Sequence, residues 1–113
     1  MKKKPLGPDL LARVADRFKV LAEPARLTVL NALREGPLHV SALMDKTGLN
    51  QANLSKHLQL LHAHGYVARR RQGVFIHYQL ADNSVFALCD IMCGQLERKL
   101  KVESSQLKLK KAS

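Results

Sequence analysis

The chain has 113 residues, 46% of them hydrophobic, which is enough for one globular domain with a modest core. It carries 19 Lys and Arg against 9 Asp and Glu, and the formal net charge of +10 favours a polyanionic partner such as nucleic acid. No apolar run approaches the roughly 18 residues of a membrane-spanning helix, and the Lys-rich N-terminus is not followed by the apolar segment of a secretory signal. The few aromatic residues, 3 Phe, 2 Tyr and no Trp, argue against binding of single-stranded nucleic acid by base stacking.

The first part of the chain predicts a basic arm followed by a helix. Residues 1–7, MKKKPLG, are typical of a disordered arm. From Pro8 to about Ala22 apolar residues recur at helical spacing, and Asp9 lies in the first turn, where the helix dipole favours an anion. Because this helix leads a small domain, we expect it to bury its apolar stripe on a partner chain.

Two short helices follow. Pro24 stands at a tolerated first-turn position of the earlier one, which ends at the strong stop Glu35–Pro37. The later one begins near His39–Ser41, with Ser41 as its expected cap, and ends at Thr47-Gly48.

The stretch between Gly48 and Gly65 predicts a further helix with two contrasting faces. Leu54, Leu58 and Leu61 recur at helical spacing and favour packing on a core. The opposite face has no carboxylate and carries Gln51, Asn53, Ser55, Lys56 and Gln59. Such side chains pair with base edges and phosphates in the DNA major groove, although an ordinary amphipathic surface helix is the alternative. Two short helices joined by a turn with a glycine form the helix-turn-helix pattern, whose second helix enters the groove.

The residues around this helix favour DNA as the partner. No Asp or Glu occurs between Asp45 and Asp82, whereas an ordinary solvated surface mixes both signs of charge. After Gly65 the hydrophobic period changes to two, which predicts strands at 66–71 and 74–80 joined at Gln72-Gly73. A hairpin in this place is a wing, and its arginines would flank the DNA backbone and supply affinity and register. They are Arg69, Arg70 and Arg71.

The chain ends with a long helix and a tail. Asp82-Asn83-Ser84 is a capping sequence for a helix that reaches about Leu100, and its apolar stripe includes Cys89, with Cys93 beside it. Residues 102–113 are polar and basic and predict a flexible tail, so the folded domain is expected at 8–101.

Three segments carry a resemblance to a known family: LAEPARLTVLNAL, GLNQANLSKHLQLLHAHGYV, and the RRQG hairpin that ends in YQL. Together they closely resemble the ArsR/SmtB family of bacterial winged-helix repressors, over roughly residues 8–100. The resemblance implies a mainly α fold with a β-hairpin wing, a winged helix-turn-helix, in a homodimer held by the first and last helices. It also implies a double-stranded DNA operator that is released when an inducer binds.

The resemblance also implies roles for single residues. The recognition-helix contacts fall on Gln51, Asn53, Ser55 and Lys56, and Thr47 and Asn50 come near the phosphates. His57 matches the family's Ser-x-His-Leu pattern, as a phosphate contact or as a satisfied, half-buried side chain. The family often has a basic residue after the turn glycine; here Val74 stands there, which shifts the expected backbone contact to Arg70 and Arg71.

The metal sites that the resemblance suggests are mostly missing from this chain. His39 and Ser41 stand where some members have a Cys-x-Cys. On the last helix Asp82 matches a zinc position, but Arg98 stands at another, and an arginine cannot ligate a cation. No metal site is therefore firm, and the zinc site is rejected.

Cys89 and Cys93 remain as the candidate sensor. On a helix their Cβ atoms are about 5–6 Å apart, whereas a disulfide needs roughly 3.5–4.5 Å. A bridging arsenic(III) or a polysulfide link would span them with less strain. Three interpretations stay open: small buried apolar residues, a thiol switch for an oxidant or persulfide, and a site for a soft thiophilic ion such as arsenite.

Other classes of function are less well supported by the sequence. No Ser/His/Asp or Cys/His arrangement and no phosphate loop is evident, so we expect no enzyme. A winged-helix regulator or architectural protein without an inducer site, its cysteines purely structural, is the alternative. Two cysteines in a chain without a secretory signal predict reduced thiols in the cytoplasm, and no membrane partner is expected.

Overall fold

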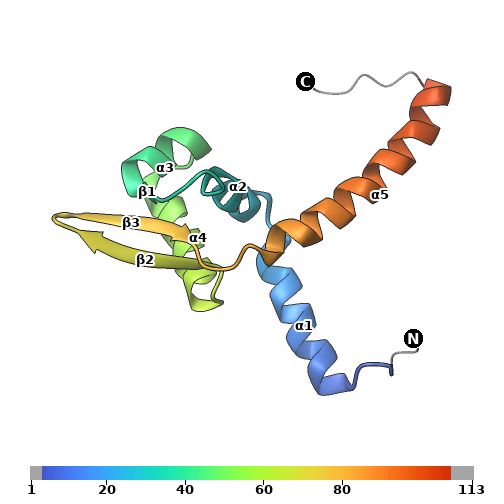
Figure 1. Ribbon diagram of the computed structural model, residues 1–113, viewed down its shortest axis with the longest axis horizontal. Helices are drawn as coiled ribbons and strands as arrows, with labels where there is room; N and C mark the ends of the chain where they lie inside the picture. Colours follow the sequence, from blue (N-terminus) through green and yellow to red (C-terminus); the bar gives the residue numbers. More distant parts are fainter. Residues whose placement is uncertain (1–3, 108–113) are drawn as a thin grey trace. The chain divides into compact units, whose positions relative to one another are not determined.

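The computed structural model describes residues 4–107, with side chains through residue 101. The chain divides into two units, Met1–Asp82 and Asn83–Ser113. The elements, in chain order, are α1 (Pro8–Leu21), α2 (Pro24–Ala32), β1 (Leu38–His39), α3 (Val40–Thr47), α4 (Gln51–Ala63), β2 (Val67–Gln72), β3 (Phe75–Leu80) and α5 (Ser84–Leu107) (Figure 1). This is the mainly helical winged helix-turn-helix that the sequence predicts, with one short strand added.

The added strand is β1, which the sequence pattern did not predict. It pairs antiparallel with β3, Leu38 opposite Tyr78 and His39 opposite His77, so the sheet order is β1-β3-β2. Two residues are too short for an alternating pattern. The strand also changes the start of α3: its N-cap is His39, not the expected Ser41, and no side chain caps it.

The turn between α3 and α4 depends on a left-handed glycine. Gly48 has φ +74° and donates its N–H to the carbonyl of Met44, which closes α3. The new helix begins three residues later, at Gln51, and is capped by Asn50, whose side chain accepts a hydrogen bond from the N–H of Asn53 at 2.8 Å. The predicted helix-turn-helix is confirmed in these details.

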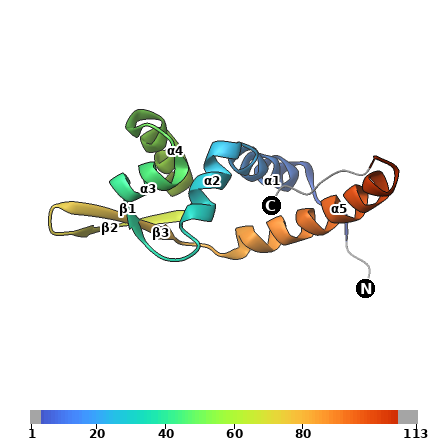
Figure 2. The same ribbon diagram turned by 90° about the horizontal axis from the view of Figure 1, so that it is seen from above.

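The core of the first unit is aliphatic and lies among α2, α3, α4 and the base of the hairpin. Its fully buried side chains are Val29, Leu30, Leu33, Leu43, Leu54, Leu58 and Leu61. Figure 2 shows α3 and α4 on one side of the hairpin, and the loop between β2 and β3 extends beyond the helices. The hairpin loop is therefore exposed, while its base is anchored by the buried Tyr66 and Val67.

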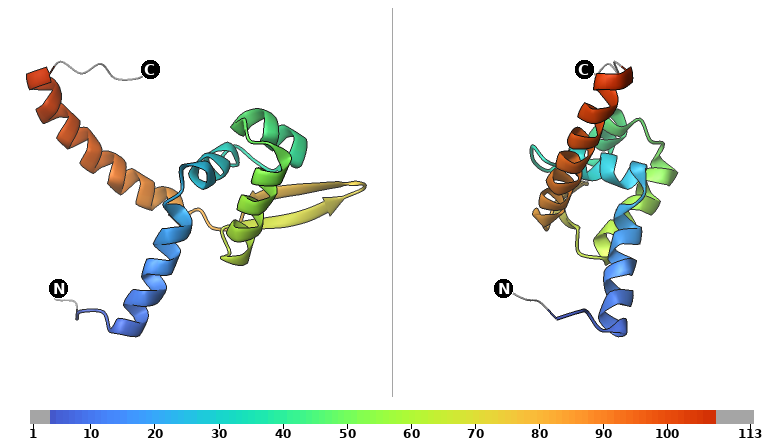
Figure 3. Two further views of the ribbon diagram at one scale, coloured as in Figure 1. Left: turned by 180° about the vertical axis from the view of Figure 1, so that it is seen from behind. Right: turned by 90° about the vertical axis from the view of Figure 1, so that its right-hand side faces the viewer.

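The described residues of the second unit form one continuous helix, α5 (Figure 3). It continues to Leu107, so the prediction of a tail from residue 102 was wrong for residues 102–107. No glycine or proline occurs from Gln95 to Leu107, and most of these residues are good helix formers. The rest of the predicted tail, and residues 1–3 of the predicted arm, lie outside the described residues; Lys4–Gly7 has no helix or strand.

Across the residues that the structure describes, every helix is too short or too polar to cross a membrane.

Candidate DNA interface

The two faces of α4 differ as the sequence predicts. Leu54, Leu58 and Leu61 are each at most 1% exposed and hold the helix against the core. The opposite face carries the exposed side chains of Gln51, Asn53, Lys56 and Gln59, with Ser55 half-buried at its edge. Because the leucine stripe leaves the helix no freedom to roll, these polar side chains are presented to solvent in a fixed order. An exposed ridge of amides and a cation suits base edges and phosphates.

The two residues expected near phosphates, Thr47 and Asn50, are both engaged in the turn. The Thr47 hydroxyl donates to the carbonyl of Leu43 at 2.6 Å and accepts from the N–H of Leu49 at 3.3 Å. Its single hydrogen is thus already used, which leaves it no donor for a phosphate. Asn50 is exposed, and the carbonyl of its side chain caps α4 while its amide NH₂ stays available as a donor.

His57 lies at the junction of three helices. It is half-buried, and its Nδ1 lies 3.2 Å from Nη1 of Arg26. A guanidinium only donates hydrogen bonds, so His57 Nδ1 is the acceptor and its ring proton is on Nε2. Arg26 also donates to the carbonyls of Val20 and Lys19 at the end of α1. The Nδ1 side of His57 is therefore satisfied within the protein, and a phosphate contact through Nε2–H stays a prediction.

The three arginines of the hairpin are exposed but do not share one face. In the β2–β3 register Arg69 lies opposite Tyr78, Arg70 opposite His77 and Arg71 opposite Ile76. Side chains alternate along a strand, so Arg70 lies on one face of the hairpin and Arg69 and Arg71 on the other. Their side chains therefore leave the hairpin in two directions.

The cysteines are free thiols one turn apart on α5. Cys89 is half-buried and Cys93 is exposed. Within the described residues no three side chains of His, Cys, Asp or Glu gather as a metal site would need. The two thiols form a pair without a third ligand from this chain's described part.

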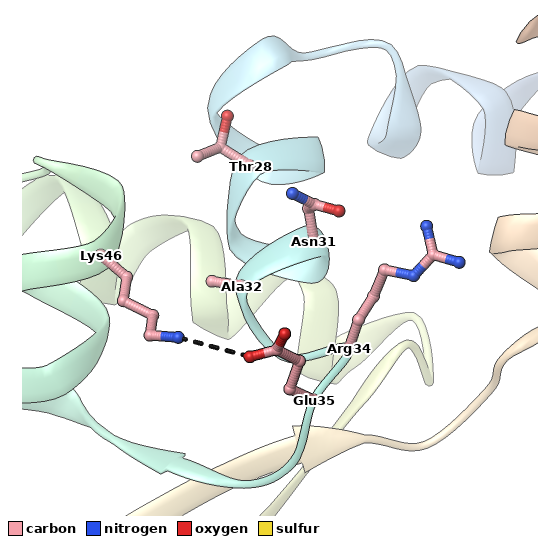
Figure 4. Close-up of a pocket in the computed structure, with 6 residues that line it drawn as sticks. All are labelled: Thr28, Asn31, Ala32, Arg34, Glu35 and Lys46. Atoms are coloured by element: carbon pink, nitrogen blue, oxygen red, sulfur yellow. Dashed lines mark ion pairs between the residues drawn. The ribbon is translucent and has the colours of Figure 1, made fainter. Parts of the chain in front are cut away.

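A polar hollow lies between α2 and the C-terminal end of α3, away from the predicted contacts. It is lined by Thr28, Asn31, Ala32, Arg34, Glu35 and Lys46 (Figure 4). Lys46 and Glu35 form an ion pair across it at 3.9 Å, with both side chains largely exposed. An exposed pair of this length contributes little stability, and mixed charge gives the hollow no clear preference for an anion.

Two residues of this interface were missed by sequence reasoning. Arg26 bonds mainly to backbone carbonyls, which carry no sequence signal. Phe75 lies edge-on against His39, with ring centroids 5.7 Å apart, and this contact depends on the unpredicted strand β1. The one sequence signal that points to Phe75 is that apolar residues directly follow the turn Gln72-Gly73, where polar residues are usual.

Comparisons with known proteins agree with this geometry. The family profile described as bacterial regulatory protein, arsR family, matches residues 23–69. The transcriptional regulator NmtR of Mycobacterium tuberculosis is 40% identical over 86 residues, which are 76% of this chain and 72% of that protein. The profile match spans α2, α3 and α4 and reaches into β2.

Solved structures have the same fold. The crystal structure of Rv0081 from M. tuberculosis has a TM-score of 0.75 at 34% identity, covering 87% of this chain and 98% of that one. The solution structure of Mb0332 from Mycobacterium bovis, a homodimeric winged helix-turn-helix DNA-binding domain, has a TM-score of 0.70 at 30% identity, covering 88% and 94%. The similarity thus extends well beyond the helix-turn-helix.

Proposed function

Because this chain belongs to the arsR family of bacterial regulatory proteins, and so is a DNA-binding transcriptional regulator and not an enzyme, we propose that it is a homodimeric repressor released from its operator by a chemical signal at Cys89 and Cys93. The observation that carries the DNA-binding part is the exposed, carboxylate-free face of α4, fixed over a fully buried leucine stripe. The protein would act in the bacterial cytoplasm, where its operator lies.

In this proposal α4 enters the major groove. Gln51, Asn53 and Lys56 reach base edges or phosphates, with Ser55 at the margin of the contact. At the two ends of the contact Asn50 and the Nε2–H of His57 donate to phosphates. Arg69, Arg70 and Arg71 on the hairpin bind the backbone on either side of it. Thr47 holds the turn and makes no direct contact in this scheme.

The dimer is proposed from exposed apolar surface on two helices. On α1 about half of each of Leu10, Leu11 and Phe18 is exposed, and on α5 the exposed apolar side chains are Leu88, Ile91, Met92, Leu96 and Leu100. Large apolar surface on a monomer marks a contact surface, and a second copy with the same faces is the partner that a two-fold operator requires. Homodimeric Mb0332 supports this assembly.

The sensor is proposed on the same apolar helix. Cys89 lies in the apolar stripe of α5 and Cys93 one turn on, with exposure enough for a reagent to reach it. An oxidant that links the sulfurs of the two thiols accepts two electrons and two protons. Arsenous acid that condenses with the two thiols forms two As–S bonds and releases two molecules of water. Either product changes the packing of the stripe and so the spacing of the recognition helices, which lowers the affinity for the operator.

A second candidate is a regulator without an inducer, its cysteines purely structural. The half-buried position of Cys89 favours this alternative, because a small apolar side chain is common there.

Footprinting on DNA upstream of the protein's own gene, with a scrambled competitor, tests the proposal. We expect a protected site with two-fold symmetry that resists the competitor. Release is then followed for the wild type, Cys89→Ser and Cys93→Ser with polysulfide, peroxide and arsenite. If both variants are still released by the reagents, the cysteines are not the sensor, but the protein can still be a repressor. If the scrambled duplex competes the protein off its site, binding is not sequence-specific and the repressor hypothesis is wrong.

A further inference from the structure

The tip of the β2–β3 hairpin is apolar, although the surface around it is polar. Val74 is 87% exposed, Phe75 is 56% exposed, and Ile76 follows with 39%. We call Val74, Phe75 and Ile76 the apolar tip. Consecutive exposed apolar side chains are unfavourable in water and mark a contact surface. The DNA contacts proposed above do not use them.

The apolar tip borders a groove that also reaches the recognition helix. The groove has a volume of about 360 Å³ and is lined by the apolar tip, by His39 and the first turns of α3, and by Gln51. Gln51 is the first residue of α4, so the tip adjoins the end of the helix that is proposed to enter the major groove. A DNA strand that passes between the helix and the hairpin would lie over this groove.

Phe75 is held in place at the edge of the groove. Its ring meets that of His39 edge-on, and His39 in turn lies against His77, with ring centroids 5.7 Å apart in each pair. The register puts Arg70 opposite His77 and Gln72 opposite Phe75, so Arg70 and Phe75 lie on the same face of the hairpin. A cation and an apolar ring thus lie diagonally across the two strands on one face of the hairpin.

We propose that Val74 and Phe75 pack on the deoxyribose C–H groups that line the minor groove beside each half-site, while Arg70 binds a neighbouring phosphate. This inference rests on the proposed function and adds an affinity-determining contact to it. A DNA backbone alternates anionic phosphates with sugars whose C–H faces are apolar, which matches a cation next to an apolar ring. Apolar side chains at minor grooves are a known mode of DNA contact.

The inference has a distinctive thermodynamic signature. A cation on a phosphate releases counterions, so its loss flattens the dependence of log K on log salt. Apolar packing on a sugar releases none, so its loss lowers affinity equally at all salt concentrations. The same loss of affinity therefore has two distinguishable causes.

The experiment measures the Kd of the full-length protein for the footprinted duplex over a range of salt. We expect Val74→Ser and Phe75→Ser each to weaken binding by about tenfold for the two wings together, with an unchanged salt slope. Arg70→Gln is the matched control on the same face, and it should lower the slope by about one per wing. Val74→Lys should bind more tightly at low salt and steepen the slope.

The outcomes separate this inference from its premise. The inference is overturned if Val74→Ser binds DNA with unchanged affinity, or if its salt slope falls together with its affinity. Val74 is so exposed that this variant should fold normally. Phe75→Leu keeps an apolar side chain and should retain most of the binding. If the Ser variants bind DNA normally but lose self-association in sedimentation, the tip docks protein and the inference is wrong. A wild type that shows no footprint instead removes the proposed function.

Discussion

Arg26 shows how one side chain positions a recognition helix without touching DNA. Its guanidinium bonds to two carbonyls at the end of α1 and to His57 on α4. Hydrogen bonds from a charged donor contribute about 1.5–3 kcal/mol each to stability. The planar guanidinium of an arginine can donate to three acceptors at once, whereas the ammonium group of a lysine cannot keep the same geometry. The guanidinium therefore links α1, the proposed dimerisation helix, to α4, the proposed recognition helix.

Arg26→Lys keeps the charge but removes the fork. We expect a lower melting temperature and a several-fold weaker operator affinity, because α4 loses its link to α1. Thermal unfolding and a binding titration measure the two effects, and Lys19→Arg is a neutral control that changes a neighbouring exposed cation. Operator affinity equal to that of the wild type would show that Arg26 serves stability alone.

Lys56 is the one cation on the exposed face of α4. Lys56→Gln should weaken operator binding and lower the salt slope by about one per subunit, because a phosphate contact is lost. Lys46→Gln removes the same charge from α3, where Lys46 pairs with Glu35, and should leave the slope nearly unchanged. Equal slopes for the two variants would place Lys56 away from the phosphates.

Single residues divide into those the sequence could predict and those it could not. The polar face of α4 follows from helical spacing and the lack of carboxylates, which are both local signals. Arg26 and Phe75 act through carbonyls and a ring brought near by distant segments, and only the fold creates these neighbours. Thr47 was placed near phosphates, but its hydroxyl is used within the turn.

At the scale of elements, the turn between α3 and α4 is set by Gly48. A Cβ added there would meet no atom within 4 Å, so only its φ of +74° resists substitution. Gly48→Ala should destabilise the fold by about 1 kcal/mol, the usual cost of a left-handed alanine. Gly48→Asn should cost less, because asparagine tolerates this conformation. Denaturant unfolding compares the two; equal losses would contradict the backbone explanation.

Among the helix boundaries, those marked by Pro24 and Gly48 were predicted correctly. The end of α2 was placed too late, because the helix stops at Ala32 and its last turn does not continue to the Glu35–Pro37 stop. Strand β1 was missed because two residues give no periodicity, and its partner β3 is distant in the chain. The end of α5 was placed too early because polar composition was taken for a tail, although no breaker follows Gly94.

At the scale of the whole molecule, the proposed assembly depends on apolar helix faces. Leu96 is 57% exposed in the single chain, so Leu96→Asp should cost the monomer little but disrupt a dimer that buries it. We expect sedimentation velocity to show a monomer, with operator affinity reduced at least a hundredfold because two half-sites are no longer joined. Lys99→Asp introduces an acid on an exposed polar position of the same helix and should remain dimeric. A dimeric Leu96→Asp would place the interface elsewhere.

The uneven charge of the chain also affects the protein when no DNA is present. The acid-free stretch places Arg69, Arg70 and Arg71 on one strand, where like charges repel, within a molecule of net charge +10. Dissolved salt screens this repulsion and so should raise the melting temperature of the free protein, while the same salt loosens its hold on a duplex. Folding stability and DNA affinity would thus respond to ionic strength in opposite directions. In a cell whose internal ion concentration rises on osmotic shock, the regulator would become more stable while it dissociates from its operator.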